Sequence, residues 1–145
     1  MMYHNYSLED YLIKIAEKSC VNQKHSAAII KNGEVINIGY NKYCSSFAKK
    51  STIHAEMDVL MNLKKKYKKH LLTNIDIVII RISSKGSILK NSRPCNQCLN
   101  ILKKFNIRRV YYSNDFGEIV YEKTIDMESG HVCAGERFHK KNKQN

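Results

Sequence analysis

Two short segments carry the side chains with the clearest chemistry. His54-Ala55-Glu56 comes first, and Pro94-Cys95-Asn96-Gln97-Cys98 follows about forty residues later. Cys95 and Cys98 are three residues apart, so at the start of a helix their sulfurs lie on one face. A helix N-terminus favours negative charge and lowers the pKa of a thiol, so two thiolates there are ready metal ligands. His54 can supply a third ligand through a ring nitrogen.

Three protein ligands of the nitrogen and sulfur type predict a zinc site. Because structural zinc sites are closed by four protein ligands, three leave a position open for water, whose pKa zinc lowers toward neutrality. Glu56 is placed to take the proton from that water and pass it to the substrate. We therefore predict His54, Cys95 and Cys98 as zinc ligands and Glu56 as the catalytic proton carrier. The alternative is a structural zinc site, which needs a fourth protein ligand and leaves Glu56 without a role.

H-x-E followed by P-C-x-x-C is the signature of the zinc deaminases. The stretch from about His25 to Ile125 resembles the cytidine deaminase-like superfamily, which includes cytidine, deoxycytidylate and tRNA adenosine deaminases and nucleic-acid-editing cytosine deaminases. The resemblance implies that Asn41, which ends Gly39-Tyr40-Asn41, hydrogen-bonds the sugar of the substrate. It also implies that the backbone N–H of Ala55 contacts the base, and that the protein is a homo-oligomer.

Hydrophobic periodicity and turn residues predict the elements that must position these side chains. We expect helices over 7–18, 53–69 and 95–105, and strands over 25–31, 34–40, 75–82, 110–113 and 119–125. Ser7 is a good N-cap for the first helix. For the second helix, Ser51 or Thr52 is the expected cap, and Met61 and Tyr67 are among the residues expected on its buried face.

The order of these elements predicts an α/β fold, a three-layer α/β/α sandwich around a mixed five-stranded sheet. Asn32-Gly33 between two strands is a strong hairpin signal. Only about four residues separate the last two strands, which is too short for a parallel crossover, so they should form an antiparallel hairpin. We expect one domain over 1–145, ending in a short basic tail.

The chain has a formal net charge of +12, with 20 Lys and only 5 Arg. Such a field attracts polyanions, from nucleotides to RNA or DNA. An A/T-rich coding sequence also produces an excess of Lys over Arg, and the charge would then have no function. A functional and a purely compositional origin of the charge therefore both stay open. Close to the cysteine pair, Arg93 could meet a substrate phosphate.

Cysteine usage and hydropathy predict a cytoplasmic protein. No run of about 18 apolar residues is present, and the first residues do not form a signal peptide. Five cysteines are an odd number, which favours thiols or metal ligands in a reducing compartment. Cys44 lies in a loop that could rim the site. His131, Cys133 and His139 form a C-terminal cluster whose spacing matches no known metal motif.

The expected reaction is hydrolytic deamination of a cytosine base to uracil, with release of ammonia, on a free nucleoside or nucleotide. The alternatives are an enzyme acting on adenosine in tRNA or cytosine in RNA or DNA, and an inactive deaminase fold that only binds. In the family, histidine at the position of His54 usually accompanies a parallel fifth strand, and cysteine there accompanies an antiparallel one. This chain combines the histidine with a predicted antiparallel hairpin, so the subfamily stays open.

Overall fold

The computed structural model describes residues 7–44, 51–66 and 73–128. In chain order its elements are α1 (Leu8–Ala16), β1 (Lys24–Lys31), β2 (Glu34–Tyr40), β3 (Lys42–Tyr43), β4 (Thr52–Ile53), α2 (Ala55–Lys66), β5 (Ile75–Ile82), β6 (Leu89–Lys90), α3 (Asn96–Lys104), β7 (Arg109–Ser113), β8 (Ile119–Lys123) and the 3₁₀ helix η2 (Thr124–Asp126). No helix in these parts of the chain is long and apolar enough to cross a membrane.

The main sheet has the strand order β2-β1-β5-β7-β8, and the short β6 pairs with β5. The β1 strand is antiparallel to both β2 and β5, whereas β5 and β7 are parallel. The β7 and β8 strands form an antiparallel hairpin, which confirms the predicted direction of the last strand. The first hairpin is also confirmed, because Asn32 and Gly33 both have positive φ, as its tight turn requires.

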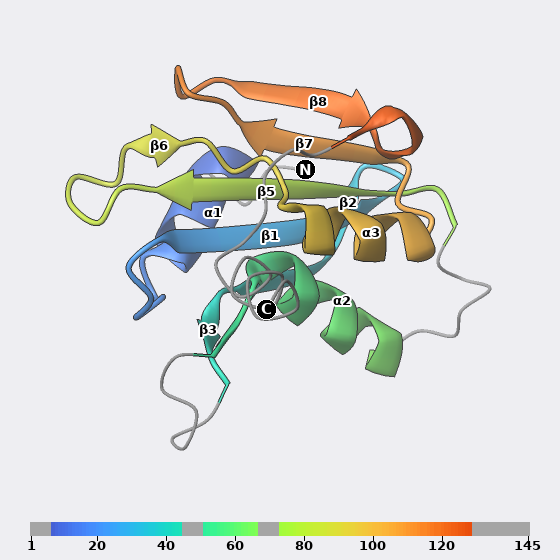
Figure 1. Cartoon of the computed structure of the whole chain (residues 1–145), viewed down its shortest axis with the longest axis horizontal. Coiled ribbons are helices and arrows are strands. Elements are labelled where there is room, and N and C mark those ends of the chain that lie inside the picture. The colour runs from blue at the N-terminus through green and yellow to red at the C-terminus, as the bar shows by residue number, and fades with distance from the viewer. Residues whose placement is uncertain (1–6, 45–50, 67–72, 129–145) are drawn as a thin grey trace, which may run out of the picture.

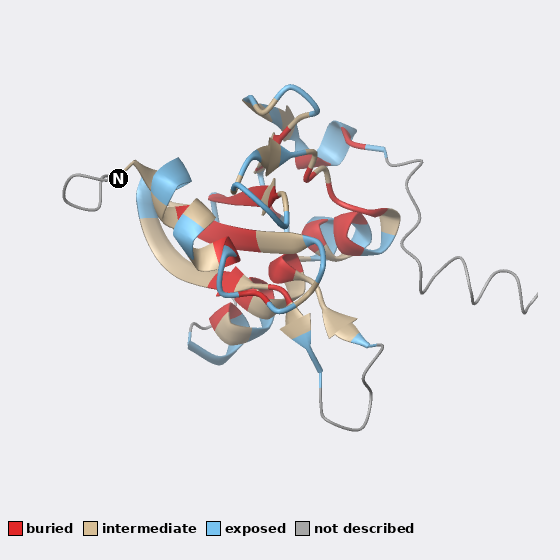
Figure 2. Cartoon of the chain, turned by 90° about the vertical axis from the view of Figure 1, so that its left-hand side faces the viewer, coloured by how far each residue is buried: buried red, intermediate tan, exposed pale blue. Residues whose placement is uncertain are grey.

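Helices cover both faces of the sheet, so the predicted three-layer arrangement is confirmed (Figure 1). One face of β5 packs with α2 and α3 through Ile77 and Ile79, and the opposite face packs with α1 through Val78 and Ile80. Alternation along a strand explains this division, since successive side chains point to opposite faces. The buried residues lie along the strands and on parts of the helices that cover them (Figure 2), in one cluster on each face of the sheet.

The second helix differs from its prediction at its start and on its surface. Thr52 and Ile53 pair with β3 as strand β4, so α2 begins only at Ala55 and neither Ser51 nor Thr52 is its N-cap. Of the residues expected on its buried face, Leu60 and Leu63 are confirmed in the core, whereas Met61 is 47% exposed because it points away from the face that they share. Tyr67 lies outside the described residues. By contrast, Ser7 caps α1 as predicted, through its side chain and the Asp10 N–H at 3.1 Å.

The topology brings the starts of α2 and α3 to one edge of the sheet. Strands β2 and β5 are both antiparallel to β1, so they run in the same direction and their carboxyl ends share an edge. The chain reaches α2 after β2 and reaches α3 after β5. In open α/β sheets the crevice outside the carboxyl ends of the strands is where ligands bind. The predicted His and Cys ligands therefore meet at this edge.

Gly39 is needed where β2 passes against the start of α2. A Cβ atom at this position would lie 2.7 Å from the Asp58 carboxylate and 3.0 Å from the backbone nitrogen of Val59. The carboxylate is itself held by the Tyr40 N–H and by Lys42, each at 3.2 Å. We expect Gly39→Ala to lower the free energy of unfolding by about 1–3 kcal/mol, as overpacking does in well-packed interiors. Urea denaturation checks this, and an unchanged midpoint would contradict it.

Candidate active site

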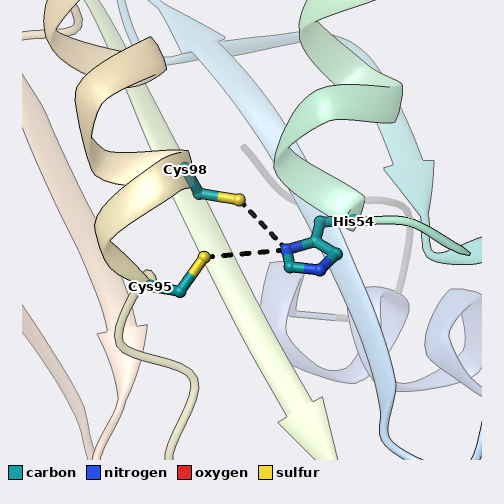
Figure 3. A group of neighbouring side chains, drawn as sticks. All are labelled: His54, Cys95 and Cys98. Carbon is teal, nitrogen blue, oxygen red and sulfur yellow. Dashed lines mark hydrogen bonds between the residues drawn. The ribbon is translucent and has the colours of Figure 1, made fainter. Parts of the chain in front are cut away.

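His54, Cys95 and Cys98 converge on one point although more than forty residues separate the histidine from Cys98. The Nδ1 atom of His54 lies 3.1 Å from the sulfur of Cys98 and 3.8 Å from that of Cys95 (Figure 3). All three ligand atoms lie within 4.8 Å of one another. His54 immediately precedes α2, Cys95 is the N-cap of α3, and Cys98 lies in the first turn of α3.

These separations fit a zinc ion. Zinc binds sulfur at about 2.3 Å and histidine nitrogen at about 2.0–2.1 Å, so tetrahedral ligands lie about 3.6 Å apart. The two nitrogen–sulfur distances fall on either side of that value. Both cysteines are buried, whereas His54 is half-buried. Within the described residues no fourth His, Cys, Asp or Glu joins the group, as an open catalytic site requires.

The two thiols differ in how readily they ionise. The hydrogen bond from the Cys98 thiol lowers the pKa of Cys95 to about 3, with burial opposing this and His54 contributing further to it. The same hydrogen bond raises the pKa of Cys98, and burial raises it further. Zinc binding requires both thiols to give up their protons, so the affinity for zinc depends on pH.

Glu56 faces the ligand cluster. It lies in the first turn of α2, is only 5% exposed, and comes two residues after His54. Its carboxylate contributes to the raised pKa of Cys98 by charge and by hydrogen bonding. Its charge also helps to raise the pKa of His54, after the larger effect of the hydrogen bond to Cys95. A carboxylate in this position can exchange protons with a molecule held at the metal.

The remaining predicted substrate contacts lie around this cluster. Ala55 is buried and begins α2, so its N–H has no partner within the helix. Both polar atoms of the Asn41 amide bond the backbone at the start of β1. Its Oδ1 accepts from the His25 N–H at 2.9 Å, and its Nδ2 donates to the Gln23 carbonyl at 2.6 Å. Asn41 thus fixes the backbone beside the site, and its contact with a sugar stays a prediction.

Arg93 is held by the sheet rather than left free. Its Nε donates to the Glu122 carboxylate at 3.0 Å, and the Tyr112 hydroxyl donates to the same oxygen at 2.7 Å. The hydrogen bond from Arg93 lowers the pKa of Glu122, so this carboxylate stays charged over a wide pH range. The network fixes the segment that leads into Cys95. A contact between Arg93 and a substrate phosphate stays a prediction.

A hollow of about 200 Å³ borders the metal ligands between α2 and α3. His54 and Cys98 are among its lining residues, and the others are Thr52, Ile53, Met57, Met61, Gln97 and Ile101. Cys44 is exposed, and its N–H donates to the Ser51 carbonyl at 3.1 Å. His131, Cys133 and His139 lie outside the described residues.

Two basic residues beside the site, His25 and Arg81, belong to none of the motifs that predicted it. They are directly opposite each other on β1 and β5, and His25 lies close enough to Glu56 and His54 to feel their charges. Arg81 did carry a signal, because it interrupts the otherwise apolar end of the run IDIVIIRI. Charged residues are almost never buried without a reason, so its place in a core strand indicates a role.

His25 should make the stability of the fold depend on pH. Burial lowers the pKa of His25 below its ordinary value of 6.5, although the charge of Glu56 opposes the shift. As pH falls below 6.5 the unfolded chain takes up this proton before the folded protein does, so the free energy of unfolding falls until the folded pKa is reached. We expect His25→Gln to reduce this fall. Urea denaturation of both proteins between pH 5 and 8, at saturating zinc, measures it, and identical curves would contradict it.

Comparison with known proteins agrees with this geometry. Residues 4–114 match the family described as the cytidine and deoxycytidylate deaminase zinc-binding region. A sequence comparison with curated proteins finds no match.

The fold is similar to solved structures of deaminases. Cytidine deaminase from Burkholderia pseudomallei superposes with a TM-score of 0.59 and 20% identity, over 91% of this chain and 100% of that one. The dCMP deaminase of the cyanophage S-TIM5 in apo form superposes with a TM-score of 0.53 and 20% identity, over 76% of this chain and 86% of that one. The complex of that enzyme with dCMP and dUMP superposes with a TM-score of 0.53 and 19% identity, over 74% of this chain and 82% of that one.

The family match covers most of the chain and includes all three ligands of the cluster and Glu56. The predicted zinc cofactor is confirmed by the zinc-binding region of the family and by a cluster compatible with zinc. The protein therefore belongs to the cytidine and deoxycytidylate deaminase family of zinc-binding enzymes, which act on C–N bonds.

Proposed function

We propose that the protein is a zinc-dependent hydrolytic deaminase that converts the cytosine of a free nucleoside or nucleotide to uracil and ammonia. The observation that supports this proposal most strongly is the buried Glu56 carboxylate, which faces a cluster of three nitrogen and sulfur ligands. A structural zinc site would need a fourth protein ligand and would have no use for this carboxylate.

His54, Cys95 and Cys98 would hold the metal, which when bound supplies a water of lowered pKa. Glu56 takes the proton from that water and gives it to the ring nitrogen of the base. As the oxygen of that water bonds the carbon that bears the amine, Glu56 passes the second proton of the water to the amine, whose bond to the carbon breaks and releases ammonia. The N–H of Ala55 orients the base, and Asn41 keeps the start of β1 in place beside it. Burial of Glu56 strengthens each of these electrostatic contacts, because water is excluded around it.

A substrate panel tests the proposed function. The purified, zinc-loaded protein is incubated with cytidine, deoxycytidine, CMP, dCMP, adenosine and guanine, and the products are separated by liquid chromatography. We expect uracil-containing products from at least one cytosine substrate and none from adenosine. Turnover of a tRNA or a single-stranded oligonucleotide, with no turnover of any free compound, would refute the proposal.

A nucleic-acid substrate is the second candidate, and one observation favours it. Besides the net charge of +12, a groove of about 440 Å³ at the opposite edge of the sheet is rich in basic side chains. Its lining consists of Lys103, Asn106, Ile107, Arg108, Arg109, Lys123, Thr124 and Ile125. Binding to oligonucleotides at graded salt distinguishes the two candidates, because a surface that tracks phosphates loses affinity steeply as salt rises.

The cytoplasmic location and the homo-oligomeric state are also proposals. The odd number of cysteines and the free thiols among the described residues support a reducing compartment. Light scattering after size exclusion measures the number of chains per particle, and a mass of 16.9 kDa would refute the oligomer.

A further inference from the structure

Three basic residues form a row across one face of the sheet. His25 on β1 is directly opposite Arg81 on β5, and Arg81 is directly opposite Lys90 on β6. Directly opposite residues share a face of the sheet. Arg81 is two residues after Ile79 on β5 and therefore points to the same face, the one that packs with α2 and α3 and carries the metal ligands. The row crosses β5 near its carboxyl end, at the edge where both helices begin.

The charge of Arg81 has no acidic partner in the described structure. Its Nε is buried and has no hydrogen-bond partner, and its Nη1 reaches only the Asn91 carbonyl at 3.5 Å. None of the ion pairs in the described residues includes Arg81. Burying such a group is unfavourable unless an anion or other acceptor meets it. Lys90 adds like-charge repulsion directly across the strand pair.

This unpaired charge lies beside the reaction site. The charge of Arg81 acts on His25, which in turn feels the charges of Glu56 and His54. On the other side, Asn91 belongs to the segment that continues into Cys95. Arg81 is half-buried as a whole, so part of its side chain is accessible at this edge. The nearby Arg93 is already held by Glu122 through its Nε.

We propose that Arg81 determines specificity by binding the phosphate of a nucleotide substrate, with Lys90 adding a second positive charge. The inference rests on the proposed function and makes it more specific: the substrate is a nucleoside monophosphate rather than a nucleoside. A guanidinium presents donors whose geometry matches phosphate oxygens. A neutral nucleoside would leave the charges of Arg81 and Lys90 uncompensated, whereas a phosphate dianion relieves both.

The test compares nucleotide and nucleoside in the same variants. For Arg81→Met we expect kcat/KM for dCMP or CMP to fall by about 10- to 100-fold, the usual effect of charged hydrogen bonds. The value for the matching nucleoside should change less than about threefold, because the nucleoside lacks the phosphate. Lys90→Met should reduce only the nucleotide value, by a smaller factor. Lys85→Met removes the same charge from the same hairpin outside the row, and should leave both values unchanged.

Binding of product separates failure of this inference from failure of the proposed function. Calorimetry with dUMP and deoxyuridine needs no turnover, and we expect the wild-type preference for dUMP to be lost in Arg81→Met. Equal losses for nucleotide and nucleoside, or no loss at all, would overturn the inference. Zinc content and thermal unfolding are measured for each variant. Should Arg81→Met not fold, Lys90→Met decides, and an unchanged ratio of nucleotide to nucleoside affinity overturns the inference.

Discussion

Replacing Glu56 by Gln should lower kcat by about 10²- to 10⁴-fold while leaving zinc bound and the fold intact. Glutamine has nearly the same shape, so it preserves the packing of a side chain that is only 5% exposed. It cannot accept a proton from water or return one to the base. The loss should therefore appear in kcat much more than in KM, because substrate contacts made by other residues are kept.

Steady-state kinetics on the best substrate of the panel and metal analysis of the same sample measure both parts of this expectation. Glu9→Gln, which neutralises an exposed carboxylate in α1, controls for the loss of one negative charge. If Glu56→Gln kept most of its activity, the role assigned to Glu56 would be wrong. If it lost zinc as well as activity, Glu56 would be supporting the metal site rather than moving protons.

Replacing Cys98 by Ala should remove zinc and activity together. Cys98 is 2% exposed and its sulfur is the closer of the two to His54 Nδ1. Two ligands hold the metal much less tightly than three, so zinc affinity should fall by more than about a hundredfold, beyond the effect of losing an outer hydrogen bond. Because a metal that binds the folded state stabilises it, added zinc should raise the Tm of the wild type but not of the variant.

Metal analysis after dialysis and thermal unfolding with and without zinc measure these effects. Cys20→Ala removes an exposed thiol that is not part of the cluster, so it should keep its zinc. Full zinc content in Cys98→Ala would show that this residue is not a ligand. A chelator should lower the Tm of the wild type and of Cys20→Ala alike.

The sequence by itself determined the metal chemistry and the main elements. Histidine, carboxylate and paired cysteines predicted an open zinc site with a proton carrier, because each residue type has a distinct chemical role, and the resemblance of their signature to that of the zinc deaminases implied the reaction. The run at 75–82 and the short link before β8 predicted a core strand and a terminal hairpin, and both are confirmed. The core strand and the hairpin depend on residues close together in the chain, where periodicity and turn chemistry decide.

Only the tertiary structure decided which distant residues share the site. Helix α2 begins at Ala55 rather than at the predicted residue 53, because Thr52 and Ile53 pair with β3, a contact that no local pattern encodes. The row of His25, Arg81 and Lys90 exists because the register of β1, β5 and β6 sets these residues opposite one another. A shift of one residue in register would turn Arg81 to the other face of the sheet. The residue types of the metal ligands thus follow from the sequence, whereas their convergence and the placement of the charges beside them depend on the packing of the helices and the pairing of the strands.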